Sequence, residues 1–383
     1  MTPGKGRTLA LAAALMGAAA CSHTMMQTSN GDVDVMPMNK PQVDVVELGV
    51  VPVKMGSRDL PKPTATPTPA MKEVLDMLAS FGAPPIEKSS PANAREAPTP
   101  KDAVMGVMAM QGKPPAVEMV GDVTHEVIPG PGGDLLARVY TPKGKGPFPV
   151  LVYYHGGGWV IASLDAYDAS ARALSNAAGA VVVSLAYRQA PTHKFPAAAD
   201  DAFAAYQWAL QNAASINGDP GRVAVGGESA GGNLAAVVSM MARDKGVKLP
   251  VHQLLVYPIT SFNFESPSYT ENANAHPLSK GAMQWFFDKY MRSDADAKNP
   301  YLIPLNGNLA GLPPATIINA EIDPLRWDGE EYARRLQAAG VPVMQKTYPG
   351  VTHEFFGMGA VVPEAKDAVN MAAMALRKAY GEQ

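Results

Sequence analysis

A chain of 383 residues is long enough for one large α/β domain, or two small ones, with a sizeable hydrophobic core. Its net charge of −3 and pI near 6.2, with no basic run, argue against a nucleic-acid-binding protein. The single cysteine, Cys21, excludes an intrachain disulfide and a cysteine-based metal site.

Residues 1–21 have the pattern of a secretory signal peptide. Two basic residues precede an apolar run from 9 to 20, which is too short to span a bilayer, and small residues end it. Because Cys21 follows directly, the segment also resembles a bacterial lipoprotein signal, although Ala18 stands where leucine is more usual. We expect an exported protein that is periplasmic, secreted or anchored in the membrane by lipidated Cys21. A cytosolic protein with an apolar start is the alternative.

Residues 22–70 have little periodicity and include a Pro/Thr-rich tract at 61–69. This composition predicts a mostly disordered tether, which would hold a folded domain at residues 71–383 away from a membrane surface.

Two helices are predicted at the start of the folded part. Residues 71–80 place apolar side chains on one helical face and are followed by Gly82, which favours a helix end. A weaker helical pattern covers 102–110, with Met105 and Met108 on its apolar face. For this second stretch, packing is favoured over substrate binding.

From residue 124 onward, predicted strands alternate with predicted helices. This alternation predicts a mostly parallel sheet with helices on both faces, in which chemistry gathers at the carboxyl ends of the strands. The first two strands flank the turn at 129–133 and predict a hairpin. The predicted strands are 124–128, 135–140, 150–154, 180–186, 222–225, 253–257, 315–320 and 341–348, and the predicted helices are 196–211, 233–243, 328–339 and 363–380.

A Gly-x-Ser-x-Gly motif lies between the strand at 222–225 and the helix at 233–243, with Ser229 at its centre. Flanking glycines let the chain turn sharply without a Cβ clash, so the serine hydroxyl is lifted clear of the sheet at a helix N-terminus. The motif alone is weak, but the strand-turn-helix context makes Ser229 a candidate nucleophile.

Ser229, Asp323 and His353 each follow the carboxyl end of a predicted strand, in the order serine, acid, histidine. This order is that of the α/β-hydrolases. An imidazole can take the proton of a serine hydroxyl and later return it, and a carboxylate can fix the imidazole tautomer. Asp328 is a rival for the acid, but it falls on a predicted helix.

Three consecutive glycines follow the strand at 150–154, within His155–Trp159. Such a run after a buried strand is costly unless its backbone N–H groups are needed. We expect them to meet a developing oxyanion, together with the N–H of Ala230, the residue after Ser229.

These motifs resemble the hormone-sensitive-lipase-like branch of the α/β-hydrolases, including its bacterial esterases. The resemblance covers roughly residues 71–380. The matching stretches are His155–Trp159, Tyr187-Arg188, Ala190-Pro191, Phe195–Ala198, Asp200-Asp201, Gly227–Gly232, Asp323–Arg326 and the segment around His353.

The resemblance implies an α/β-hydrolase fold with a mostly parallel eight-stranded sheet and a two-part helical cap at about 71–120 and 260–300. It also implies hydrolysis of carboxylic esters without metal or cofactor. In this sequence the nucleophile is then Ser229, the acid Asp323 and the base His353. The implied oxyanion donors are Gly157, Gly158 and Ala230.

This sequence departs from the family pattern at three positions. Glu228 precedes the nucleophile where aspartate is common, and Trp327-Asp328 follows Asp323–Arg326 where the family usually has two acidic residues. Glu354 follows the histidine where glycine is frequent, which puts a charge near the base and could shift its pKa.

The sequence predicts a serine carboxylesterase that acts on a small-molecule ester with a small to medium, apolar acyl group. An amide, lactone or carbamate hydrolase with the same residues is an alternative. A non-catalytic ligand receptor on this fold is a second one, and the presence of His353 argues against it, because family members with that role have lost the base.

Overall fold

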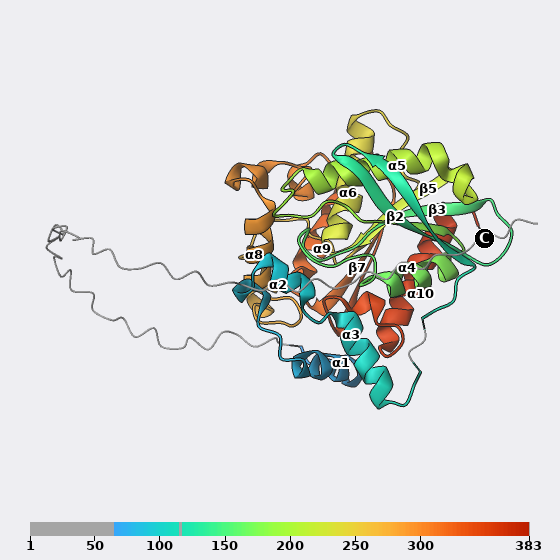
Figure 1. Cartoon of the computed structure of the whole chain (residues 1–383). Helices are drawn as coiled ribbons and strands as arrows, with labels where there is room; N and C mark the ends of the chain where they lie inside the picture. The colour runs from blue at the N-terminus through green and yellow to red at the C-terminus, as the bar shows by residue number, and fades with distance from the viewer. Residues whose placement is uncertain (1–64, 115–116, 383) are drawn as a thin grey trace, which may run out of the picture. The chain divides into compact units, whose positions relative to one another are not determined.

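The computed structural model describes residues 65–114 and 117–382 (Figure 1). The predicted signal peptide, Cys21 and nearly all of the predicted tether lie outside these residues. The first helix, α1 (Pro69–Ser80), begins two residues before its predicted start at Met71. Thr68 caps it by accepting a hydrogen bond from the N–H of Met71.

In the described part of the chain, eight strands form one sheet in the order β1-β2-β4-β3-β5-β6-β7-β8. β2 is antiparallel to both β1 and β4, and the other neighbouring strands are parallel. The predicted hairpin and the mostly parallel sheet are therefore confirmed. The strands are β1 (Asp122–Gly130), β2 (Gly133–Thr141), β3 (Phe148–Tyr154), β4 (Val181–Leu185), β5 (Gly218–Glu228), β6 (Gln253–Val256), β7 (Ala315–Ile322) and β8 (Val343–Thr352).

Helices cover both faces of the sheet, as predicted (Figure 1). One face packs against α4 (Asp168–Ala178) and α10 (Pro363–Ala379). The opposite face packs against α5 (Ala197–Asn212), α6 (Ala230–Asp244) and α9 (Arg326–Ala338).

Strand β3 shows how the sequence produces this layering. Its side chains alternate, so that Val150, Val152 and Tyr154 join the core on one face of the sheet. Leu151 and Tyr153 join the core on the other face. All five are fully buried, which explains why the strand is a continuous apolar run rather than an alternating one.

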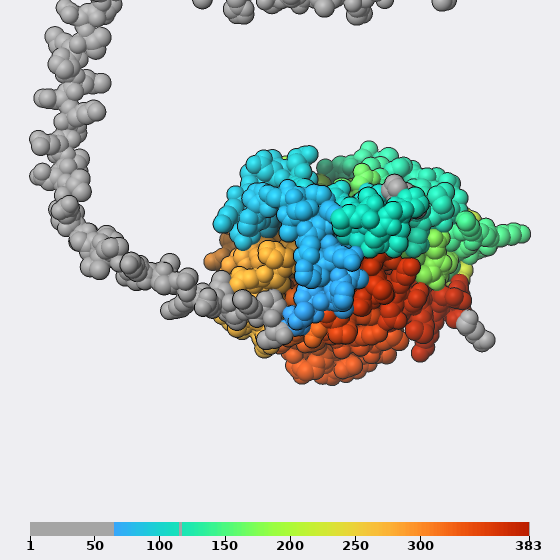
Figure 2. Space-filling view, turned by 90° about the horizontal axis from the view of Figure 1, so that it is seen from below, coloured from blue at the N-terminus to red at the C-terminus, as the bar shows by residue number. Residues whose placement is uncertain are grey.

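Two further groups of helices lie outside these two layers. In Figure 2 the blue N-terminal helix α1 lies against the red C-terminal part of the chain. None of the helices in the described ranges has the length and apolarity needed to cross a bilayer. The first group is α1, α2 (Pro91–Glu96) and α3 (Pro100–Met110), and the second is α7 (Pro267–Glu271) and α8 (Lys280–Tyr290). The 3-10 helices are η1 (Ile86–Lys88), η2 (Ala213–Ile216), η3 (Asp294–Lys298), η4 (Pro304–Asn306) and η5 (Phe355–Gly357).

Candidate active site

Ser229 stands at a sharp turn between β5, which ends at Glu228, and α6, which begins at Ala230. Its backbone has φ 57° and ψ −119°, a strained conformation for a residue with a side chain. A Cβ at Gly231 would lie 1.9 Å from the carbonyl oxygen of Tyr154, so only glycine fits there. The predicted tight turn around Ser229 is thus present.

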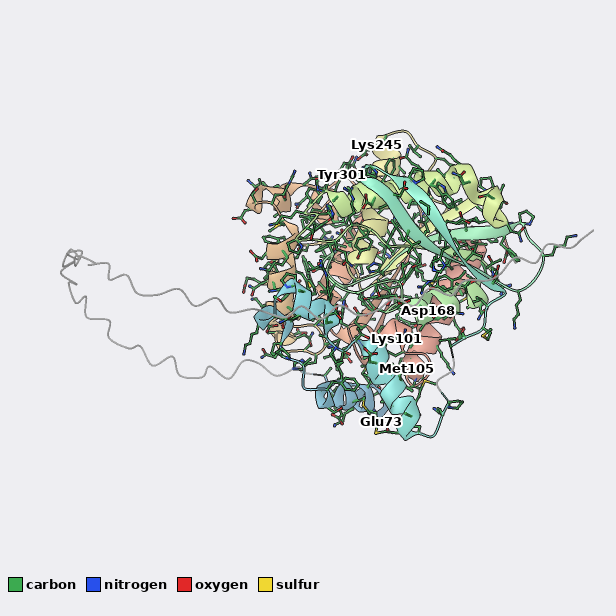
Figure 3. All side chains as sticks on the ribbon, viewed as in Figure 1. Glu73, Lys101, Met105, Asp168, Lys245 and Tyr301 are labelled. Atoms are coloured by element: carbon green, nitrogen blue, oxygen red, sulfur yellow. The ribbon has the colours of Figure 1, made fainter. Side chains whose placement is uncertain are left out.

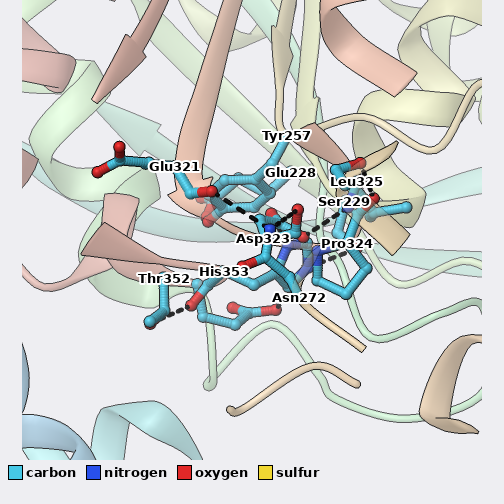
Figure 4. A network of polar contacts seen from close by, with 12 residues as sticks. Glu228, Ser229, Tyr257, Asn272, Glu321, Asp323, Pro324, Leu325, Thr352 and His353 are labelled. Atoms are coloured by element: carbon cyan, nitrogen blue, oxygen red, sulfur yellow. Dashed lines mark hydrogen bonds and ion pairs between the residues drawn. The ribbon is translucent and has the colours of Figure 1, made fainter. Parts of the chain in front are cut away.

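The three residues predicted to form a catalytic triad are brought together by the turns after β5, β7 and β8 (Figure 4). Nε2 of His353 lies 2.9 Å from Oγ of Ser229. Nδ1 of His353 lies 2.6 Å from Oδ2 of Asp323. All three side chains are buried, so Nε2 of the imidazole can take up the serine proton away from bulk water while the carboxylate holds the imidazole tautomer.

The structure also separates the two candidate acids. Asp323 uses one carboxylate oxygen for His353, and the other accepts a hydrogen bond from the N–H of Leu325 at 2.8 Å. Asp328 lies on α9, and its Oδ2 accepts from the N–H groups of Thr260 and Ser261 at 3.0 and 2.9 Å. Asp328 therefore anchors a loop and does not contact the imidazole.

Opposing effects act on the pKa of His353. Burial lowers it, but the charge of Asp323 and the hydrogen bond to it act in the other direction, and the charges of Glu354 and Glu228 add to them. The balance raises the pKa above its usual value. The site therefore stabilises the imidazolium that forms when the serine proton is taken up.

The predicted oxyanion donors lie beside Ser229. Gly157 and Gly158 line the same pocket as Ser229, and their φ angles of 92° and 57° favour glycine. A Cβ at Gly158 would meet the ring of Phe286 at 2.1 Å. The N–H of Ala230 is in the first turn of α6, where a helix leaves its N–H groups without an intrahelical partner.

Two residues that hold the oxyanion loop were not found by the sequence analysis. Arg95 of α2 donates to the carbonyls of Val160 and Ala190, at 2.8 and 2.7 Å. Gln189 donates to the carbonyl of Ile161 at 2.9 Å. These contacts join segments distant in the chain, and no local pattern in the sequence signals them.

Other residues of the family motifs pack against the loop that contains Gly157 and Gly158. The ring of Tyr187 stacks on His155 with centroids 4.4 Å apart, and its hydroxyl donates to the carbonyl of His155 at 2.9 Å. Arg188 forms an ion pair of 2.7 Å with the fully buried Asp201. The guanidinium stabilises the ionised form of this buried carboxylate, and the pair ties the segment after β4 to α5.

Glu228, one of the departures from the family pattern, is completely buried next to the nucleophile. The hydroxyls of Tyr153 and Tyr257 both donate to its carboxylate. Burial, together with the charge of Glu354, raises the pKa of Glu228 to about 7. The longer arm of glutamate thus reaches two tyrosines beneath the site, and the neutral acid is favoured there below that pH.

Glu354, the residue after the base, has a left-handed backbone with φ 72°. Tyr167 donates to its Oε1 at 2.6 Å, and the same oxygen lies 3.8 Å from Nε2 of His353. Its side chain remains 18% exposed and lines the pocket. A second carboxylate therefore faces the reactive edge of the imidazole.

A pocket of about 1810 Å³ opens above Ser229 and His353. In Figure 3, Met105 and Lys101 lie on α3 and Asp168 lies at the start of α4, and all three line the pocket. Much of the wall is apolar. Its apolar lining includes Leu75, Leu78, Met105, Met108, Phe286 and Phe356.

Comparison with known proteins identifies the family. Residues 151–357 match the family model described as the alpha/beta hydrolase fold. The chain belongs to the α/β-hydrolase family. The resemblance to its hormone-sensitive-lipase-like branch is confirmed by the relatives below.

Two similar relatives of this α/β-hydrolase come from Mycobacterium tuberculosis. The carboxylic ester hydrolase LipN is 46% identical over 251 residues, which is 64% of this chain and 67% of LipN. The carboxylesterase NlhH is 45% identical over 251 residues, which is 64% of this chain and 79% of NlhH. Among solved structures, an esterase of Pyrobaculum calidifontis is 37% identical with a TM-score of 0.73, covering 82% of this chain and 98% of that one.

Proposed function

We propose that this protein is a serine carboxylesterase that hydrolyses small to medium acyl esters through an acyl-enzyme on Ser229. The observation that carries the proposal is the hydrogen-bonded series from Ser229 through His353 to Asp323 at the floor of a large pocket. The names of the relatives, which are esterases and carboxylesterases, support the same activity.

In the proposed acylation step, Oγ of Ser229 attacks the ester carbonyl carbon while Nε2 of His353 takes the hydroxyl proton. Asp323 stabilises the resulting imidazolium through the 2.6 Å contact to Nδ1. The N–H groups of Gly157, Gly158 and Ala230 bind the oxyanion. His353 then gives the proton to the departing alcohol oxygen, which leaves the acyl group on Ser229.

The pocket favours esters with an apolar acyl group. Leu75 and Leu78 of α1 and Met105 and Met108 of α3 line it. Methionine side chains are flexible and adapt to acyl groups of different shape. Burial of each additional methylene contributes about 0.8 kcal/mol, so affinity should rise with acyl length until the apolar wall is filled.

Labelling with a fluorophosphonate probe tests the proposal directly. We expect intact-protein mass spectrometry to show one added probe mass, on Ser229, because the imidazole activates only a serine within hydrogen-bonding distance. The same experiment on His353→Ala should show almost no labelling. A folded wild type that does not react would contradict an assembled triad and would favour the receptor alternative.

We also propose that the protein is exported through residues 1–21, and is either anchored by lipidated Cys21 or released. The basic start, the apolar run and the small residues before Cys21 support this. Mass spectrometry of the N-terminal peptide from the full chain expressed in a bacterium tests it. A peptide that begins at Cys21 with added lipid indicates the anchor, processing without lipid indicates release, and an intact N-terminus contradicts export.

A further inference from the structure

Glu354 is a carboxylate at the reacting centre that the mechanism described so far does not use. Its Oε1 lies 3.8 Å from Nε2 of His353, the nitrogen that also contacts Ser229 at 2.9 Å. The hydroxyl of Tyr167 donates to the same Oε1 and fixes the direction of the carboxylate. The side chain is partly exposed to the pocket, so solvent can reach it.

The backbone gives a second reason to look for a role of this side chain. Glu354 has φ 72°, in the left-handed region, where a residue with a Cβ costs about 1–2 kcal/mol more than glycine. Glycine would fit this turn with less strain. The glutamate side chain is therefore present at a position whose backbone disfavours it, which is common where a side chain has a function.

Two atoms 3.8 Å apart can share one water molecule, since hydrogen bonds of ~2.8 Å from a single oxygen span a larger separation. We propose that Glu354 positions the water that hydrolyses the acyl-enzyme. This inference rests on the proposed esterase function. The carboxylate accepts one proton of the water in a hydrogen bond and leaves the other proton directed at Nε2 of His353.

The proton transfers in deacylation show why the carboxylate acts on the attacking water and not on the substrate ester. In deacylation the water oxygen bonds to the acyl carbon, one water proton passes to Nε2, and the other stays on the oxygen, hydrogen-bonded to Glu354. The bond to Oγ of Ser229 then breaks, and His353 returns the proton to Oγ. The product acid keeps the second proton, and Glu354 is unchanged.

In acylation the alcohol oxygen of the ester carries no proton when it approaches Nε2. A carboxylate beside it has no proton to accept, and its charge acts there only by supporting the imidazolium of His353, an effect that acylation and deacylation share. The hydrogen bond from the attacking group to Glu354 is therefore made in deacylation alone, and Glu354 is a positioning residue for that step.

The test compares Glu354→Gly with the wild type on p-nitrophenyl esters, whose good leaving group makes acylation fast. Glycine suits the left-handed backbone, so the variant should fold. We expect kcat to fall about 10- to 100-fold. Because deacylation slows far more than acylation, KM should fall nearly in parallel with kcat, kcat/KM should change much less than kcat, and the burst of nitrophenol equal to the enzyme concentration should become easier to resolve.

Acyl transfer to methanol is a second readout that a merely structural role would not move. Methanol has a single hydroxyl proton, which goes to Nε2, so it gains nothing from Glu354. At a fixed methanol concentration, the ratio of methyl ester to acid should rise roughly tenfold in Glu354→Gly. Glu354→Gln keeps an acceptor oxygen and should restore part of the wild-type ratio.

Glu126→Ala is the matched control, because it also removes one carboxylate and Glu126 lies on β1, not among the residues that line the pocket. Its kinetics and product ratio should match the wild type. If kcat and kcat/KM of Glu354→Gly fall together without a burst, or if the product ratio is unchanged, the inference is wrong. A wild type that hydrolyses no ester would instead contradict the proposed function itself.

Discussion

Replacement of Ser229 by alanine is expected to lower ester turnover on the order of 10⁶-fold, because no other group can form the acyl-enzyme. The hydroxyl is the one atom removed, and its hydrogen bond in this structure is to His353. Alanine keeps the Cβ that already occupies the strained turn at φ 57°, so the fold should be retained. Steady-state assays with p-nitrophenyl esters measure the loss.

Ser163→Ala is a suitable control, since Ser163 lines the same pocket on an exposed part of the loop after the glycines. It should retain nearly full activity. Circular dichroism and the melting temperature should show that both variants are folded. Turnover by Ser229→Ala close to that of the wild type would show that Ser229 is not the nucleophile.

The parts of the site that the sequence predicts are those determined by local sterics. The glycines around Ser229 are required because a Cβ would meet backbone atoms, such as the carbonyl oxygen of Tyr154 against Gly231. Such a requirement acts at a fixed position in the chain and so leaves a motif. The continuous apolar run of β3 is visible for a similar reason, since the strand is covered on both faces.

Helices that are buried mainly through small residues are harder to predict from the sequence. α4 was not predicted, because only Leu174 among its buried residues is a large apolar side chain. The others are alanine, serine and aspartate, so the buried face has helical spacing but few of the large apolar residues by which a buried face is recognised. The helix packs closely on the sheet through these small residues, and that fit exists only in the folded protein.

Contacts between segments far apart in the chain also could not be predicted from the sequence pattern. Arg95 reaches the carbonyl of Val160, 65 residues away, and Tyr153 of β3 and Tyr257, just after β6, both donate to Glu228. Neither arrangement follows from spacing, because the partners are defined by sheet order. The sequence identifies Glu228 and Glu354 as departures from the family, and the structure shows which tyrosines they contact.

The second large loss of turnover is expected when Asp323, the acid that contacts His353, is replaced. Asp323→Asn should lower turnover about 10⁴-fold, because an amide cannot hold the imidazole tautomer that receives the serine proton. Asp328→Asn should leave turnover within a few-fold of the wild type, since Asp328 contacts Thr260 and Ser261 and not His353. Comparable losses in both variants would contradict the separation of the two carboxylates.

Asp328→Asn should also change how the free energy of unfolding depends on pH. Burial raises the pKa of Asp328 from 3.8 to about 8, although two N–H groups donate to it. The folded state thus holds a proton that the unfolded state releases, so this contribution to stability is full below pH 3.8 and is lost as pH rises through 8. Between pH 5 and 8 the wild type should lose roughly 4 kcal/mol more unfolding free energy than Asp328→Asn, which cannot ionise. Urea unfolding at the two pH values measures the difference, and equal losses in both proteins would show that Asp328 is ionised in the folded state throughout.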